Sequence, residues 1–231
     1  MIGVLGAGNG VVADIGSRLI DWPWVGDHLS EIRARLVEHI VLTVLAVGFG
    51  VLIAIPLALL SARRRRLYTP ILAITGILFT IPALAGFVLL LPLTGLSRTT
   101  AVIPLVAYTL LILIRNTVTG LDGVPPEVKD AATGMGYTRT RRLLRVELPL
   151  AMPAIIAGVR IATVTTIGLV TVTALIGQGG LGRFIIDGQQ RDFRTPLVVG
   201  TALSIALAVA ADLLLVGALR LATPWARRRE R

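Results

Sequence analysis

Residues 40–62, IVLTVLAVGFGVLIAIPLALLSA, form an apolar run without a single charged side chain. A helix needs about 20 predominantly apolar residues, at about 1.5 Å each, to cross a hydrocarbon core about 30 Å thick. The run therefore predicts a membrane-spanning helix. Further apolar stretches long enough to span cover residues 68–94, 99–120, 151–176 and 196–219. The predicted fold class is an all-α integral membrane protein, with about five spanning helices within residues 38–222.

The composition of the whole chain agrees with a membrane protein. Hydrophobic residues make up 55% of the 231 residues and charged ones 16%, whereas soluble domains carry about 25% charged residues. The apolar residues come in blocks, so too little polar surface remains to coat a soluble globule. Within residues 68–94, Pro82 predicts a break or kink in a single span, with a re-entrant end as one reading.

The basic residues predict the orientation of the spans. The net charge is +10, and the Arg runs at 63–66, 139–145 and 227–231 border apolar blocks without interleaved aromatic residues. This pattern is typical of cytoplasmic loops rather than of nucleic-acid binding. With the N-terminus outside, fourteen Lys and Arg lie in inner segments and seven in outer ones. We therefore expect a cytoplasmic C-terminus, with a basic tail over residues 223–231.

The N-terminal segment 1–37 is expected to lie on the extracytoplasmic side. Residues 14–38 are polar but contain Trp22 and Trp24, which favours an amphipathic helix with both indoles at headgroup depth. A disordered tail is the alternative. A glycine-rich start at residues 6–10 resembles a dinucleotide-binding turn by spacing, but Val11 stands where a small residue is needed and no βαβ unit follows.

Metal and thiol chemistry is not expected in this chain. It has no cysteine and only two histidines, too few for disulfides, thiolate sites or a histidine metal cluster. No catalytic, metal-binding or cofactor-binding residues are therefore predicted. The chain also lacks the glycine-rich Walker loop that cradles ATP phosphates, so we do not expect it to be an enzyme.

Two charged residues fall inside predicted spans at matching depth. Arg160 lies in the fourth span and Asp212 in the fifth. Charges within a membrane are costly and are usually paired or line water. We predict an ion pair between them, with a structural role as an open alternative to substrate contact.

A glycine-rich stretch follows the fourth span on the predicted outer side. Glycine lets a chain turn tightly and lets backbones approach closely, so a structured outer turn is favoured over a flexible loop. The spacing also matches a nucleotide-binding fingerprint, but the position after a membrane span argues against that function. The turn residues are Gly177, Gly179, Gly180 and Gly182.

The cytoplasmic connection at residues 122–149 is longer than a simple loop requires. Its start, Pro125-Pro126-Glu127, is a helix-start signal. A short helix of small residues is expected from Asp130, followed by a basic helical stretch that ends at Pro149. A short helix with a small-residue face beneath a bundle could dock into a groove on another protein; a basic linker along the inner surface is the alternative.

This loop resembles the "EAA" coupling motif of ABC importer permeases, the binding-protein-dependent transport system inner membrane components. The motif has an acidic residue and two alanines, then three residues and a glycine, then nine residues and an aliphatic-x-Leu-Pro end. The sequence keeps this spacing, with Asp in place of Glu and Val in place of Ile. The residues that the resemblance assigns to coupling, with Gly134 from the short spacer added, are Asp130, Ala131, Ala132, Gly134, Gly136, Val146, Leu148 and Pro149.

The resemblance extends to a narrower group, the permeases for glycine betaine, carnitine and choline. It rests on strings such as RNT at 115–117, AGVRIA at 157–162 and IGQGGLG at 176–182. The resemblance implies a type I importer transmembrane domain in the bacterial cytoplasmic membrane. It also implies two ATPase subunits that use ATP and Mg²⁺, a second permease copy or paralogue, and a solute-binding protein. A methionine-type permease, an ATP-independent channel and an intramembrane enzyme are the alternatives.

Overall fold

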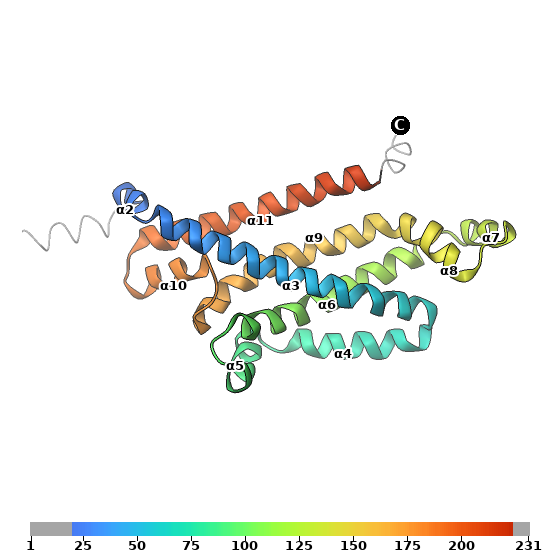
Figure 1. Cartoon of the computed structure of the whole chain (residues 1–231), viewed down its shortest axis with the longest axis horizontal. Helices are drawn as coiled ribbons and strands as arrows, with labels where there is room; N and C mark the ends of the chain where they lie inside the picture. Colours follow the sequence, from blue (N-terminus) through green and yellow to red (C-terminus); the bar gives the residue numbers. More distant parts are fainter. Residues whose placement is uncertain (1–19, 224–231) are drawn as a thin grey trace, which may run out of the picture.

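The computed structural model describes residues 20–223 and is helical through most of that range, with no strand in it (Figure 1). Four helices are long and apolar enough to cross a membrane, and a bent pair of shorter helices can serve as a fifth span. These elements confirm the predicted all-α membrane fold with about five spans. The long helices are α3 (Leu29–Arg63), α6 (Arg98–Asp122), α9 (Leu148–Val172) and α11 (Arg194–Ala222).

The bent pair consists of α4 (Tyr68–Thr80) and α5 (Ala83–Thr94), which meet at an angle of 91°. A short 3₁₀ turn, η1 (Arg65–Leu67), leads into α4. Ile81 has an extended backbone (φ −63°, ψ 123°), the conformation favoured for a residue that precedes proline. The Tyr108 hydroxyl of α6 donates a hydrogen bond to the Ile81 carbonyl oxygen. The break predicted near Pro82 is thus present, and α6 satisfies a backbone group that the break exposes.

Three long helices form the packed centre of the molecule. In Figure 1, α3 and α9 run along the length of the bundle with α6 beside them. One buried cluster joins Leu42 of α3, Leu105 of α6 and Val170 of α9. A second cluster includes Ala54, Leu113 and Ala162 from the same three helices. Small residues at such contacts let helices approach closely in a membrane, where packing rather than water exclusion drives association.

The last long helix, α11, is far more exposed than the others. Only 6% of its most apolar window is buried, against 44% for α6. It packs against α9 and against the short helix α10 (Gly182–Gln190). Its outer surface carries large apolar side chains such as Ile205, Leu213 and Leu214. This face is suited to lipid or to another membrane helix.

The N-terminal part differs from the prediction. Residues 29–38 were expected in a separate surface helix, but they belong to α3, whose 35 residues extend to about 52 Å. Only α2 (Trp22–Asp27) precedes it, and the two helices are separated at His28. Because the helix is continuous, its backbone hydrogen bonds run without interruption from the polar turns into the span. The predictions for residues 1–19 and for the tail beyond Thr223 lie outside the described residues.

Only one of the two tryptophans has the exposed position expected for headgroup contact. Trp22 is 71% exposed. Trp24 instead stacks on His28 with ring centroids 4.2 Å apart, and it meets Phe184 and Phe193 edge-on at 6.0 and 5.8 Å. Aromatic pairs favour these stacked and edge-to-face arrangements. Trp24 therefore joins α2 to α10 and to the start of α11.

Candidate coupling loop and intramembrane ion pair

The loop between α6 and α9 folds into two short helices and one wide turn. The first helix is α7 (Pro126–Gly134), with Pro126 in its first turn and Glu127 beside its N-terminus. Proline suits the start of a helix because its missing N–H would have no partner there, and an acidic residue complements the helix dipole. The remaining elements are α8 (Arg139–Arg142) and the π-helical turn η2 (Leu143–Glu147).

The second half of the loop does not end at Pro149, contrary to the prediction. From Arg139 the chain continues through α8 and η2 into α9, and Pro149 lies in the first turn of α9. The Leu148 N–H bonds to the Leu143 carbonyl, which is the wider π-type pattern. Because the backbone hydrogen bonds change their pattern just before Pro149, its missing N–H is tolerated as at the start of a new helix.

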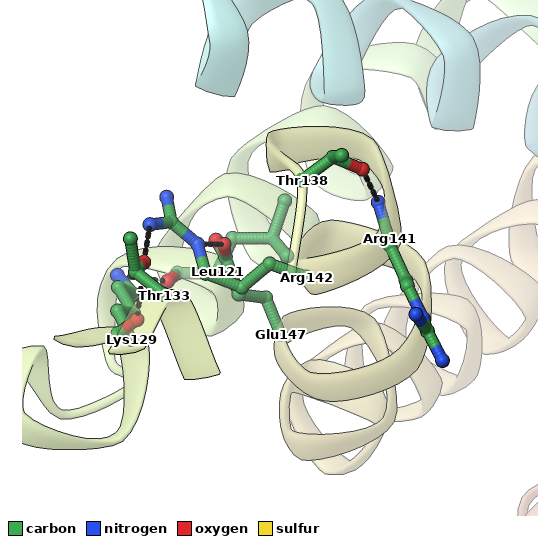
Figure 2. Close-up of polar contacts among 7 residues, drawn as sticks. All are labelled: Leu121, Lys129, Thr133, Thr138, Arg141, Arg142 and Glu147. Atoms are coloured by element: carbon green, nitrogen blue, oxygen red, sulfur yellow. Dashed lines mark hydrogen bonds and ion pairs between the residues drawn. The ribbon is translucent and has the colours of Figure 1, made fainter. Parts of the chain in front are cut away.

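Arg142 links the two halves of the loop (Figure 2). Its Nε donates to Glu147 Oε1 at 2.7 Å, and its Nη1 donates to Thr133 Oγ1 at 2.9 Å. The planar guanidinium presents several donors in a fixed fork, so one side chain can hold two partners. The contact joins the last turn of α7 to the π turn before α9. The two short segments are thereby held together as a unit.

A second contact ties α7 to the end of a spanning helix. Lys129 Nζ donates to the Leu121 carbonyl oxygen at 3.1 Å, as Figure 2 shows. Carbonyls in the last turn of a helix have no partner within the helix, and a cation there also complements the helix dipole. A displacement of α7 would therefore act on the C-terminal end of α6 as well as on α9.

The predicted coupling residues divide between an inner and an outer face. Ala132 is buried, and Val146, Leu148 and Pro149 are half-buried where η2 leads into α9. Met135, which follows α7, is 70% exposed. The outward residues of the motif are Asp130, Ala131, Gly134 and Gly136. The loop thus presents small side chains and one flexible apolar side chain away from the bundle.

Gly136 provides the turn that separates α7 from α8. Its φ is +80°, a left-handed conformation, and a Cβ at this position would meet no atom within 4 Å. Glycine adopts this conformation without the steric cost of a side chain. The backbone, rather than crowding, accounts for glycine at this position.

The structure brings Arg160 and Asp212 together across α9 and α11. Arg160 Nε lies 2.8 Å from Asp212 Oδ1, and Nη2 lies 2.9 Å from Oδ2. This is the parallel two-bond geometry that makes guanidinium–carboxylate pairs strong and directional. The side chains are 31% and 34% exposed and line a cavity of about 580 Å³ between the two helices. Arg115, the other arginine near a span, is not the partner of Asp212.

The glycine-rich stretch forms a tight turn before α10. It follows the 3₁₀ turn η3 (Thr173–Ile176), and Gly177, Gly179 and Gly180 have φ values of +78°, +115° and +48°. Gly180 lies directly on α3, because a Cβ there would be 2.6 Å from His39 Cβ. His39 is buried and donates from Nε2 to the Ile167 carbonyl at 3.0 Å. The turn therefore packs against the point where α3 and α9 are joined.

Two features of this site were not found by sequence reasoning. Arg142 and Glu147 are five residues apart, a spacing that does not share a face in an α-helix but does so across the π turn. Arg63 and Arg64 at the end of α3 line one pocket with Arg139 of α8. Neither relationship has a signal in the local sequence, because one depends on an irregular turn and the other on helix packing.

Comparisons with known proteins identify the class of this fold. Residues 50–220 match the family described as "Binding-protein-dependent transport system inner membrane component". Among similar structures is the inward-facing MetNI methionine ABC transporter, with a TM-score of 0.76, 22% identity, and coverage of 83% of this chain and 96% of the other. An amino acid ABC transporter crystallised with histidines gives a TM-score of 0.73 at 20% identity, over 87% and 98%. At these identities the likeness concerns the fold.

Curated relatives are closer in sequence. The osmoprotectant import permease protein OsmW of Salmonella typhimurium strain LT2 is 37% identical over 82% of this chain and 90% of its own length. The Bacillus subtilis strain 168 choline permease OpuBB is 36% identical over 84% and 90%. The glycine betaine/carnitine/choline permease OpuCD of that strain is 38% identical over 77% and 78%. The chain therefore belongs to the family of binding-protein-dependent transport system inner membrane components. It is the permease component of an ABC importer.

Proposed function

We propose that this permease forms the translocation pathway for a small zwitterionic or quaternary ammonium osmoprotectant of the glycine betaine, choline or carnitine type. The proposal on substrate is supported by the names of relatives that are 36% to 38% identical over most of the chain. ATP is hydrolysed by partner ATPase subunits, since members of this family are membrane subunits without an ATPase site of their own.

The observation that carries the coupling proposal is the construction of the loop at residues 122–149. Its outward face consists of small residues and Met135. Its inward side is fixed by Arg142 to the π turn that leads into α9 and by Lys129 to α6. A partner that grips this face would therefore move two spanning helices together. We propose that the face docks into a cleft of the ATPase, and that closure of two ATPases drives the spans between inward and outward openings.

The proposed assembly has two permease chains, either identical or paralogous, two ATPases and an extracytoplasmic solute-binding protein. The exposed apolar face of α11 supports a further membrane contact. The excess of Lys and Arg in segments 61–66, 122–145 and 220–231 supports a cytoplasmic position for the loop and the C-terminus. The N-terminus and the glycine-rich turn are then outside.

Affinity purification of the tagged chain from its native membranes tests this proposal. Mass spectrometry of the eluate is expected to identify an ATPase and a solute-binding protein. The binding protein is then titrated with glycine betaine, choline and methionine, and we expect saturable binding of a quaternary ammonium compound. Binding of methionine alone would overturn the substrate assignment. A chain that purifies alone, while other transporters keep their subunits, would favour an ATP-independent channel.

A further inference from the structure

A basic pocket lies between the end of α3 and the second half of the loop. Its volume is about 630 Å³, and its charged lining consists of four arginines and one glutamate. The glutamate, Glu147, already accepts a hydrogen bond from Arg142 at 2.7 Å. The pocket therefore holds three further guanidinium groups, on Arg63, Arg64 and Arg139.

These three arginines have no acidic partner within the described part of the chain. No carboxylate of residues 20–223 pairs with them, and Arg63 only donates a long hydrogen bond of 3.4 Å to Thr140 Oγ1. The next arginine along the chain behaves differently, since Arg65 pairs with Asp122 at 2.5 Å outside the pocket. The three guanidinium groups in the pocket are thus left without a carboxylate from the described residues to neutralise them.

The position of the pocket points to the source of an anionic ligand. Arg63 follows immediately after the uncharged run 40–62, and η2 leads directly into the spanning helix α9. Thr140 and the apolar residues Ala62 and Leu143 complete the lining. The pocket therefore lies where two spans leave the hydrocarbon core. Basic pockets between spanning helices at this level suit phospholipid head groups, and guanidinium groups match phosphate oxygens in geometry.

We propose that this pocket binds the phosphate of an anionic phospholipid of the inner leaflet. Arg63 and Arg64 would contact it from the end of α3, and Arg139 from the start of α8. The bound lipid would connect the first span to the loop that carries Arg142. The ligand site is separate from the outward face around Asp130 and Gly134, so the proposal requires membrane insertion but not docking of an ATPase.

Native mass spectrometry of the delipidated permease complex in mild detergent tests the proposal. The complex is titrated with phosphatidylglycerol and, separately, with phosphatidylcholine, which carries the same phosphate but no net charge. We expect preferential retention of phosphatidylglycerol. The double variant Arg63→Gln/Arg139→Gln should bind it about thirtyfold more weakly, because each of the two basic residues near a membrane surface contributes on the order of 1 kcal/mol.

The matched control is Arg66→Gln/Arg141→Gln, which removes the same charge outside the pocket. Neither residue lines it, and Arg141 lies over the Tyr137 ring at 4.6 Å, with its side chain directed away from Arg142 in Figure 2. We expect this control to change phosphatidylglycerol affinity by less than twofold, and Arg63→Lys/Arg139→Lys to recover part of the binding.

Three results would overturn the proposal. If the pocket variant and the control lose phosphatidylglycerol affinity equally, the lipid is held by general attraction to the basic surface rather than by a site. Equal retention of phosphatidylcholine would show that the negative charge is not recognised. Retention of phosphatidylglycerol by the isolated permease but not by its complex with the ATPase would assign the pocket to the subunit interface. A thermal unfolding midpoint measured for each variant ensures that only folded protein is compared.

Discussion

The guanidinium of Arg160 and the carboxylate of Asp212 form a two-bond ion pair between α9 and α11, the two spans on either side of the glycine-rich turn. Apart from α10, α9 is the main packing partner of α11, whose surface is otherwise exposed. The pair therefore fixes the position of α11 relative to α9 and the rest of the bundle. Both side chains line a cavity of about 580 Å³ between these two helices.

The ion pair predicts a characteristic pattern of single and exchanged variants. Arg160→Gln or Asp212→Asn leaves one charge without its partner at membrane depth, which is costly. We expect each to reduce the amount of monodisperse protein recovered from membranes, measured by fluorescence-detected size-exclusion chromatography. The exchange Arg160→Asp/Asp212→Arg should recover most of that loss. If the exchanged variant is recovered as poorly as the single variants, the two charges do not stabilise the fold by pairing with each other.

The hydrogen bonds of Arg142 predict that its substitution reduces uptake more than substitution of the neighbouring Arg141. Arg142→Gln removes the contacts to Glu147 and Thr133, and hydrogen bonds to charged groups contribute on the order of 1.5–3 kcal/mol. We expect ATP-driven uptake into proteoliposomes to fall by about tenfold. Arg141→Gln, which removes a cation that stacks on Tyr137, should change uptake by less than twofold. Equal effects of the two substitutions would contradict a specific role for the network.

The glycine-rich turn predicts different costs for two alanine substitutions. At Gly180 a Cβ would lie 2.6 Å from His39 Cβ and 2.7 Å from the Arg35 carbonyl oxygen, whereas at Gly177 it would meet nothing within 4 Å. Both glycines have positive φ, so Gly177→Ala carries only the backbone cost of about 1–2 kcal/mol. Gly180→Ala adds a packing cost of about 1–3 kcal/mol. We therefore expect a lower thermal unfolding midpoint for Gly180→Ala than for Gly177→Ala. The reverse order would contradict the close contact at Gly180.

The orientation can be tested by cysteine labelling, because the chain contains no cysteine of its own. Glu127 in α7 and Gln190 at the end of α10 are both exposed. In intact cells, an impermeant maleimide should label Gln190→Cys and should label Glu127→Cys only after permeabilisation. The opposite pattern would place the loop outside, where it could not meet a cytoplasmic ATPase.

The sequence was sufficient for the features that follow from local chemistry. The length and apolarity of residues 40–62 predicted a span, and Pro82 predicted the break between α4 and α5. It was less informative where tertiary packing decides. Residues 29–38 look amphipathic in isolation, yet they extend α3, and Pro149 looks like a helix end, yet a π turn accommodates it.

The contacts of the coupling loop lay beyond sequence reasoning for a related reason. Arg142 reaches Glu147 because η2 is wider than an α-helical turn, and it reaches Thr133 because Gly136 reverses the chain. Arg63 and Arg139 lie in one pocket although they are far apart in sequence. Pairings of this kind depend on how helices pack, and residue spacing in the sequence does not predict that packing.

The central claim, that the loop couples this permease to an ATPase, is tested most directly by co-purification of the ATPase with a single variant. Gly136→Trp places a large side chain on the outward surface of the loop, while Gly26→Trp makes the same change at an open position in α2 at the opposite end of the bundle (Figure 1). We predict that the native chain and Gly26→Trp retain the ATPase in stoichiometric amount. Gly136→Trp should lose it and fail in uptake, while remaining monodisperse in the membrane fraction. Normal ATPase retention and normal uptake by Gly136→Trp would contradict the account.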